Sequence, residues 1–115
     1  MQTETIVDFD PNTLNLKSKG IVVTAYIELP NGFDVNQIDI ASILLNDSVP
    51  ALTKPTKIGD YDSDGIPDLM VKFETEKTQE ILLSGEKVPI IITGKVFYNG
   101  KYLNFRGDDI IKVIQ

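Results

Sequence analysis

The sequence of 115 residues contains no histidine, no cysteine and no tryptophan. Without histidine and cysteine, the chain lacks the commonest general base, the thiolate nucleophile and the usual ligands of transition metals. Its serines have no obvious activating base beside them, and the carboxylate separation that glycoside hydrolysis requires is not readable from a sequence. We therefore predict that the protein is not an enzyme.

Positive charge and long apolar runs are also scarce. The chain has 17 acidic and 11 basic residues, a formal net charge of -6, and no basic patch that would displace counterions from phosphates. No apolar run approaches the length of a membrane span or of a signal-peptide core. These absences predict that the protein binds no nucleic acid and does not insert into a membrane. We also expect the isolated domain to be monomeric.

What the chain does contain is an aspartate-rich stretch over residues 60–68, Asp-Tyr-Asp-Ser-Asp-Gly-Ile-Pro-Asp. Aspartates so close together repel one another unless a cation lies among them. Known calcium loops take ligands from positions 1, 3, 5, 7 and 9, the seventh through its backbone carbonyl, with glycine at position 6. Gly65 occupies the sixth place here. The predicted Ca²⁺ ligands are therefore Asp60, Asp62, Asp64, the Ile66 carbonyl and Asp68. The alternative is an Asp/Gly-rich surface turn without an ion.

The residues after the loop distinguish it from a helix-loop-helix calcium site. Such a site closes with a bidentate glutamate at position 12, where this chain has Val71. Pro67 suits the first residue of a strand, and residues 69–73 are β-rich and alternate. We therefore predict that the loop leads into a strand and that the protein is not an EF-hand.

Most of the remaining chain predicts short strands separated by turns. Residues 47–59 predict an irregular edge region, and residues 74–83 predict a short helix, with Thr75 as its N-cap, crossing between two sheets. Asn99-Gly100 predicts a tight hairpin, and Arg106-Gly107 a further turn. The clearest pattern, residues 21–29, alternates between two faces: Ile21, Val23, Ala25, Ile27 and Leu29 on one, and Val22, Thr24, Tyr26 and Glu28 on the other. The strand patterns cover residues 5–9, 14–17, 21–29, 42–46, 69–73, 88–93, 95–98, 102–105 and 110–114.

These patterns predict one all-β domain over residues 1–115, with a core at about residues 5–114. The expected fold is an antiparallel immunoglobulin-like β-sandwich with at most one short crossover helix, and a closed barrel is the alternative. Apolar residues make up 42% of the chain and charged residues 24%, as in ordinary globular domains. Because there are no disulfides, the core and a metal ion are the expected sources of stability.

The chain resembles a known type of module over nearly its whole length. The specific parts are the run Leu-Asn-Leu-Lys-Ser-Lys-Gly at residues 14–20 and the aspartate loop, which is similar to the strand-flanked DxDxDGxxD loops of integrin-type and related extracellular β proteins. Together they resemble an immunoglobulin-like module of secreted and cell-surface proteins of bacteria and archaea. The resemblance implies an extracellular location, neighbouring domains of the same polypeptide as partners, and no known catalytic activity. A signal sequence would lie outside this chain.

The sequence thus predicts a non-enzymatic structural module of an extracellular protein, stabilised by Ca²⁺. The alternative function is a carbohydrate- or protein-binding module whose surface the ion orders. Its platform for sugar would consist of aromatic side chains, particularly the three around the Asn99-Gly100 turn; the candidates are Tyr26, Tyr61, Phe97, Tyr98, Tyr102 and Phe105. Core packing and cross-strand pairing of these aromatics are the structural interpretation that we prefer. A third hypothesis is a cytosolic or phage-derived β domain whose aspartate loop holds no ion.

Two further features have a functional and a structural interpretation. Asp8, Asp10, Asp108 and Asp109 would form a second cation site if the terminal strands pair, whereas the structural interpretation makes them turn and strand-end residues. The tripeptide Arg106-Gly107-Asp108 is the one that animal integrins recognise, but a framework role at the last turn is the interpretation that we prefer.

Overall fold

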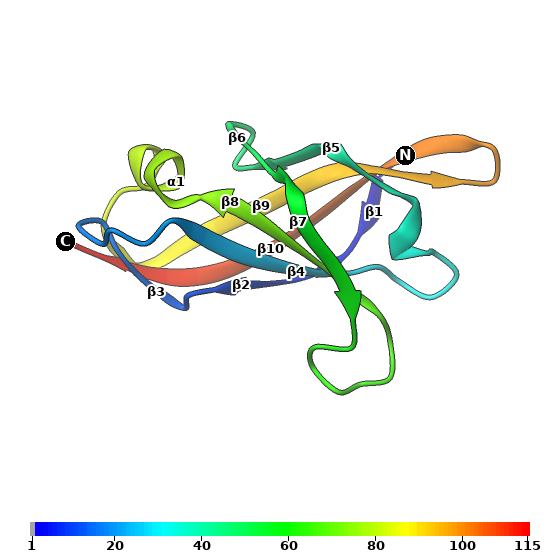
Figure 1. The fold of residues 1–115 in the computed structure, drawn as a ribbon, viewed down its shortest axis with the longest axis horizontal. Coiled ribbons are helices and arrows are strands. Elements are labelled where there is room, and N and C mark those ends of the chain that lie inside the picture. The colour runs from blue at the N-terminus through cyan, green and yellow to red at the C-terminus, as the bar shows by residue number, and fades with distance from the viewer. Residues whose placement is uncertain (1) are drawn as a thin grey trace.

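Residues 2–115, which the computed structural model describes, form two β-sheets packed face to face (Figure 1). The first sheet is built on the order β10-β9-β5-β6, and two short strands, β1 and β3, both pair with β10. Its strands are β1 (Gln2–Glu4), β3 (Thr13–Asn15), β5 (Ile38–Leu45), β6 (Val49–Pro50), β9 (Gly85–Tyr98) and β10 (Lys101–Ile114).

The second sheet has the order β2-β4-β8-β7. It contains β2 (Ile6–Asp10), β4 (Val22–Glu28), β7 (Leu52–Gly59) and β8 (Asp68–Glu74), all paired antiparallel. The two strand orders correspond to the A-B-E-D and G-F-C sheets of immunoglobulin-type sandwiches. The predicted all-β sandwich is confirmed, and within residues 2–115 the sheets do not close into the alternative barrel.

One hydrophobic core fills the space between the sheets. In β4 the inward positions Val23, Ala25 and Ile27 are buried as the alternation predicts, but Ile21, expected on the same face, lies before the strand and is 85% exposed. Three phenylalanines, Phe9, Phe73 and Phe105, are fully buried and come from strands of both sheets. Their large apolar surfaces make them the main contributors to the packing between the sheets.

The hairpin β9–β10 sets the length of the molecule. Each of its strands has 14 residues, which at the usual rise corresponds to about 46 Å, close to the longest extent of 44 Å. Asn99 and Gly100 connect them with φ angles of 49° and 80°, as a two-residue hairpin turn with two positive φ angles requires. The predicted hairpin is confirmed, but the predicted turn at Arg106-Gly107 is wrong because β10 continues through it.

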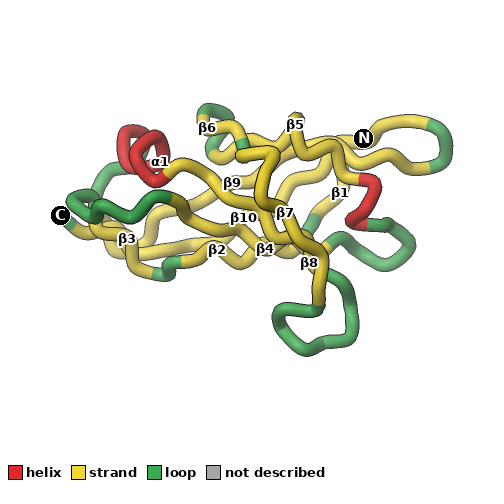
Figure 2. Tube along the Cα trace, viewed as in Figure 1, coloured by secondary structure: helices red, strands yellow, loops and turns green. Residues whose placement is uncertain are grey.

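The N-terminal segment changes sheet twice. β1 runs parallel to β10 in the first sheet, β2 joins β4 in the second, and β3 returns to β10 (Figure 2). The Thr5 backbone N–H continues the first ladder by donating to the Arg106 carbonyl at 2.9 Å. Ordered structure therefore starts before the predicted boundary at residue 5, and Thr3 is buried.

Two connections also differ from expectation. Residues 47–59, predicted as irregular, contain β6 and the eight-residue strand β7. The predicted crossover helix is present as α1 (Thr75–Ile81), which links β8 to β9 and thus the two sheets, but its N-cap is Glu74 and not Thr75. A 3-10 helix, η1 (Val35–Gln37), precedes β5. No helix within residues 2–115 is long and apolar enough to cross a membrane.

Candidate metal centre

The aspartate loop connects β7 to β8 and lies at the end of the second sheet (Figure 1). Ile27 of β4 pairs with Leu69 of β8, and both side chains are buried in the core. Because side chains alternate along a strand, the next residues, Glu28 and Asp68, face the opposite, outer side of the sheet. Both are nevertheless buried, with 7% and 3% of their surface exposed.

Backbone N–H groups already orient the loop carboxylates. The Asp60 carboxylate accepts from the Asp64 N–H at 3.1 Å and from the Gly65 N–H at 2.8 Å. Asp64 accepts from the Ile66 N–H at 2.8 Å, and Asp68 accepts from the Tyr61 N–H at 3.0 Å. The positive φ of Gly65, 84°, provides the sharp turn that this arrangement needs.

The carboxylates converge in two groups that share Asp62. Asp60, Asp62 and Asp64 form one group, and Glu28, Asp62 and Asp68 form the other. Within each group, one oxygen per residue lies within 4.8 Å of the others. Two oxygens bound to the same Ca²⁺ are at most about 5 Å apart, twice the usual metal–oxygen distance. The acidic groups therefore have the spacing to hold a metal ion.

Within residues 2–115, Glu28 is a buried carboxyl group with one unpartnered oxygen. Its Oε1 has no hydrogen-bond partner among the described residues, and no ion pair found there involves Glu28 or the loop aspartates. Proton sharing with Asp64, burial, and the charges of Asp64 and Asp62 raise the pKa of Glu28 to about 8. The pKa of Asp64 is lowered, because its carboxylate interacts with the Glu28 side chain and accepts a hydrogen bond from the Ile66 N–H. The site thus favours either a proton or a cation.

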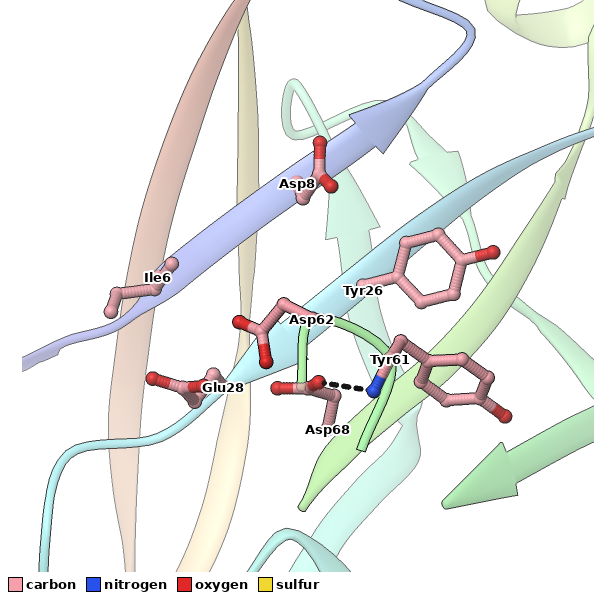
Figure 3. Close-up of a pocket in the computed structure, with 7 residues that line it drawn as sticks. All are labelled: Ile6, Asp8, Tyr26, Glu28, Tyr61, Asp62 and Asp68. Carbon is pink, nitrogen blue, oxygen red and sulfur yellow. Dashed lines mark hydrogen bonds between the residues drawn. The ribbon is translucent and has the colours of Figure 1, made fainter. Parts of the chain in front are cut away.

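A cavity of about 180 Å³ lies beside this cluster (Figure 3). Tyr26 of β4 and Tyr61 of the loop form one side of it, with ring centroids 4.9 Å apart, and their contact holds the loop over the sheet. Asp8 of β2 also lines the cavity, and burial and the charges of Asp109 and Asp10 raise its pKa. The lining residues are Ile6, Asp8, Tyr26, Glu28, Tyr61, Asp62 and Asp68.

The structure brings together Asp60, Asp62 and Asp64 in one group and places Asp68 with Asp62 in the other, while the carbonyl of Ile66 stays a predicted ligand. Sequence reasoning missed Glu28. It was placed correctly on the outer face of its strand, but its burial depends on a loop more than 30 residues away in the chain. The available signal was the missing carboxylate at position 12, which implies a ligand from elsewhere in the fold.

The second candidate cation site is not assembled among the described residues. The Asp109 carboxylate accepts a hydrogen bond from the Phe9 N–H at 2.9 Å, and Asp108 lies 4.0 Å from the Arg106 guanidinium. Asp8 and Asp10 belong to β2, and none of these aspartates is part of a convergent acidic group. The interpretation as turn and strand-end residues holds for Asp10, at the end of β2, but Asp8, Asp108 and Asp109 lie inside strands.

The Arg106-Gly107-Asp108 tripeptide lies inside β10, not in a loop. Gly107 is buried against the N-terminal segment, and a Cβ atom there would come within 2.6 Å of the Thr5 carbonyl oxygen. This supports a framework role for the tripeptide, although in a strand and not in the expected turn.

The hairpin aromatics form cross-strand contacts but do not pack in the core. Phe97 pairs with Tyr102 across the strands, with centroids 5.2 Å apart, and Tyr98 contacts Phe33 at 4.5 Å. Phe97, Tyr98 and Tyr102 are 41%, 36% and 58% exposed, so the preferred core packing is wrong for them. A sugar- or protein-binding role of this surface stays a prediction.

Comparisons with protein-family models, with curated proteins and with solved structures give no match to this chain. The interpretation of the acidic site therefore depends on its own chemistry and geometry.

Proposed function

We propose that the protein is a non-enzymatic structural module of an extracellular or cell-surface protein, in which Ca²⁺ bound by the aspartate loop stabilises the fold. The observation that carries this proposal is the convergence of five carboxylates, from Glu28 and the four loop aspartates, in two groups that share Asp62, with no ion pair to a cationic side chain in residues 2–115. Such a cluster is electrostatically unfavourable without a cation.

The choice of Ca²⁺ follows from the ligands. All of the proposed ligand atoms are oxygens, and most belong to carboxylates. Backbone hydrogen bonds within the loop orient these carboxylates, and Ca²⁺ accepts the irregular coordination geometry that such a loop provides. Mg²⁺ demands a tighter octahedral shell and retains several waters, so it should substitute poorly. Extracellular calcium modules typically bind with dissociation constants of about 10⁻⁴ to 10⁻³ M, which suits calcium concentrations outside cells.

Thermal unfolding in chelator and in added Ca²⁺ tests the proposal. Binding to the folded state alone stabilises it by about 2.7 kcal/mol at one hundred times the dissociation constant, which raises the melting temperature of a domain of this size by roughly 10 °C. We expect this increase for the wild type and its loss for Asp62→Ala, because Asp62 belongs to both acidic groups. Its side chain is exposed, so the variant should still fold.

Asp47→Asn is the matched control. Asp47 lies in the β5–β6 turn, outside both acidic groups, and its φ of 58° is one that asparagine tolerates. It removes the same charge but should retain the full calcium response. Identical melting temperatures of the wild type with chelator and with Ca²⁺ would exclude the proposed function.

A further inference from the structure

We propose that Glu28 of β4 is a direct Ca²⁺ ligand that closes the site from outside the loop and so takes the role of the glutamate missing at position 12. This inference rests on the proposed function and extends it to a residue that lies 32 positions before the first loop aspartate. It places one ligand on β4, outside the segment of residues 60–68 that carries the others.

The first support is the environment of the side chain. Glu28 is 93% buried, its Oε1 has no hydrogen-bond partner among residues 2–115, and one of its carboxyl oxygens lies within 4.8 Å of an oxygen of Asp62 and of an oxygen of Asp68. An unpaired carboxylate oxygen at this depth is costly, because burial removes its hydration without supplying a partner. A metal ion between these three side chains would supply that partner.

The second support is the number of ligands. The loop offers five oxygens, one each from Asp60, Asp62, Asp64, the Ile66 carbonyl and Asp68. Ca²⁺ takes six to eight, often with a bidentate carboxylate that completes a pentagonal bipyramid. Two oxygens from Glu28 would bring the total to seven, the number reached when a calcium loop ends in its own bidentate glutamate.

The third support is the register of the sheet. Since Ile27 pairs with Leu69 in an antiparallel ladder, Glu28 and Asp68 occupy neighbouring positions on the outer face. Two carboxylates at such positions repel each other unless a cation bridges them. An ion held by both would join β4, β8 and the loop, so that its binding energy acts on the sheet as well as on the loop.

Calorimetric titration of the full chain with CaCl₂ tests this inference, with Glu28→Gln as the main variant. Glutamine retains the size of the side chain but removes its charge and one of its acceptor oxygens. We expect at least about a tenfold weaker affinity, because even indirect partners of metal ligands typically contribute 10- to 100-fold. Glu80→Gln, on the exposed face of α1, makes the same chemical change away from the site and should bind like the wild type.

The melting temperature in chelator separates ligation from a structural role. Because Glu28→Gln removes a carboxylate from an acidic cluster, the metal-free variant should melt at or above the wild-type temperature while its gain on adding Ca²⁺ falls. Wild-type affinity in the variant would overturn the role of Glu28 and leave the proposed function intact. Failure of the wild type to bind Ca²⁺ would overturn both, and a variant that melts lower in chelator with unchanged affinity would make Glu28 a structural residue.

Discussion

At Gly107 the N-terminal segment passes so close to β10 that there is no room for a side chain. A Cβ atom at this position would lie 2.6 Å from the Thr5 carbonyl oxygen and 2.6 Å from Val7 Cγ2. Real contacts of this kind do not fall below about 3 Å, and one of the two neighbours is backbone, which moves only with the strand. The close approach therefore depends on glycine.

Gly107→Ala should lower the free energy of unfolding by about 1–3 kcal/mol, because the overpacked strand must shift. Urea denaturation measures the loss. Gly20→Ala is the control, since a Cβ there would be at ordinary distances of 3.7 Å or more from its neighbours. Equal stabilities of the two variants would contradict the steric explanation. Calcium affinity should not change in either variant.

Residue by residue, the sequence was informative where ligands are adjacent in the chain. The alternation of Asp60, Asp62 and Asp64 with Gly65 is a local pattern, so their convergence could be predicted before any fold was known. Glu28 could not be assigned in the same way. On its own strand it is an ordinary outward-facing polar residue, and only the β4–β8 register brings it beside Asp68.

Among the elements, the β7–β8 loop combines exposure with dependence on the proposed ion. Every residue from 60 to 67 is exposed, and the described hydrogen bonds of the loop run mainly between its own backbone and its own aspartates. Repulsion among those aspartates favours opening of the loop when no cation is bound. Local opening should therefore be controlled by calcium without unfolding of the sandwich.

Limited digestion with chymotrypsin should detect this opening after Tyr61, which is 43% exposed. In chelator we expect faster cleavage there, and Ca²⁺ should slow it by up to about the ratio of its concentration to its dissociation constant. Tyr98 and Tyr102, beside the hairpin turn, are an internal control because they are exposed but lie outside the acidic cluster. Cleavage after Tyr61 that is insensitive to calcium would contradict an ion-dependent loop.

Elements were predictable where local chemistry dominates. The Asn99-Gly100 turn and the alternation of β4 are encoded in adjacent residues, and both are present. The strand β7 was missed because its prolines and lysines weaken the β pattern, and pairing with β8 supplies what its own sequence lacks. The break expected at Arg106-Gly107 is absent because Gly107 accommodates the neighbouring segment instead of forming a turn.

For the whole molecule, the excess of acidic charge is the dominant electrostatic property. The formal net charge is -6, and one bound Ca²⁺ would reduce it to -4. Self-repulsion of this kind destabilises the compact state, and salt screens it over a distance of about 10 Å at 0.1 M. The five carboxylates of the site concentrate this repulsion in one place.

Raising NaCl from about 0.02 to 0.5 M should therefore raise the melting temperature in chelator by a few degrees, because screening weakens the repulsion. With saturating Ca²⁺ the increase should be smaller, since the ion already compensates the cluster. The Asp62→Asn variant in chelator should also respond less than the wild type. An equal salt response in all three samples would indicate that the repulsion is spread over the surface and not concentrated in the site.

The pairing of β1 and β3 with β10 has a mechanical consequence. Both short strands run parallel to β10, and β1 lies toward the hairpin end of the long axis while the C-terminus lies at the other end (Figure 1). A force that pulls the two ends of the chain apart would pull β10 in one direction and the two short strands in the other. The hydrogen bonds between β10 and these strands would then be loaded in shear at the same time. The aspartate loop belongs to the other sheet and lies outside this line of force. Calcium would thus govern how the domain resists heat, while the terminal strands govern how it resists tension.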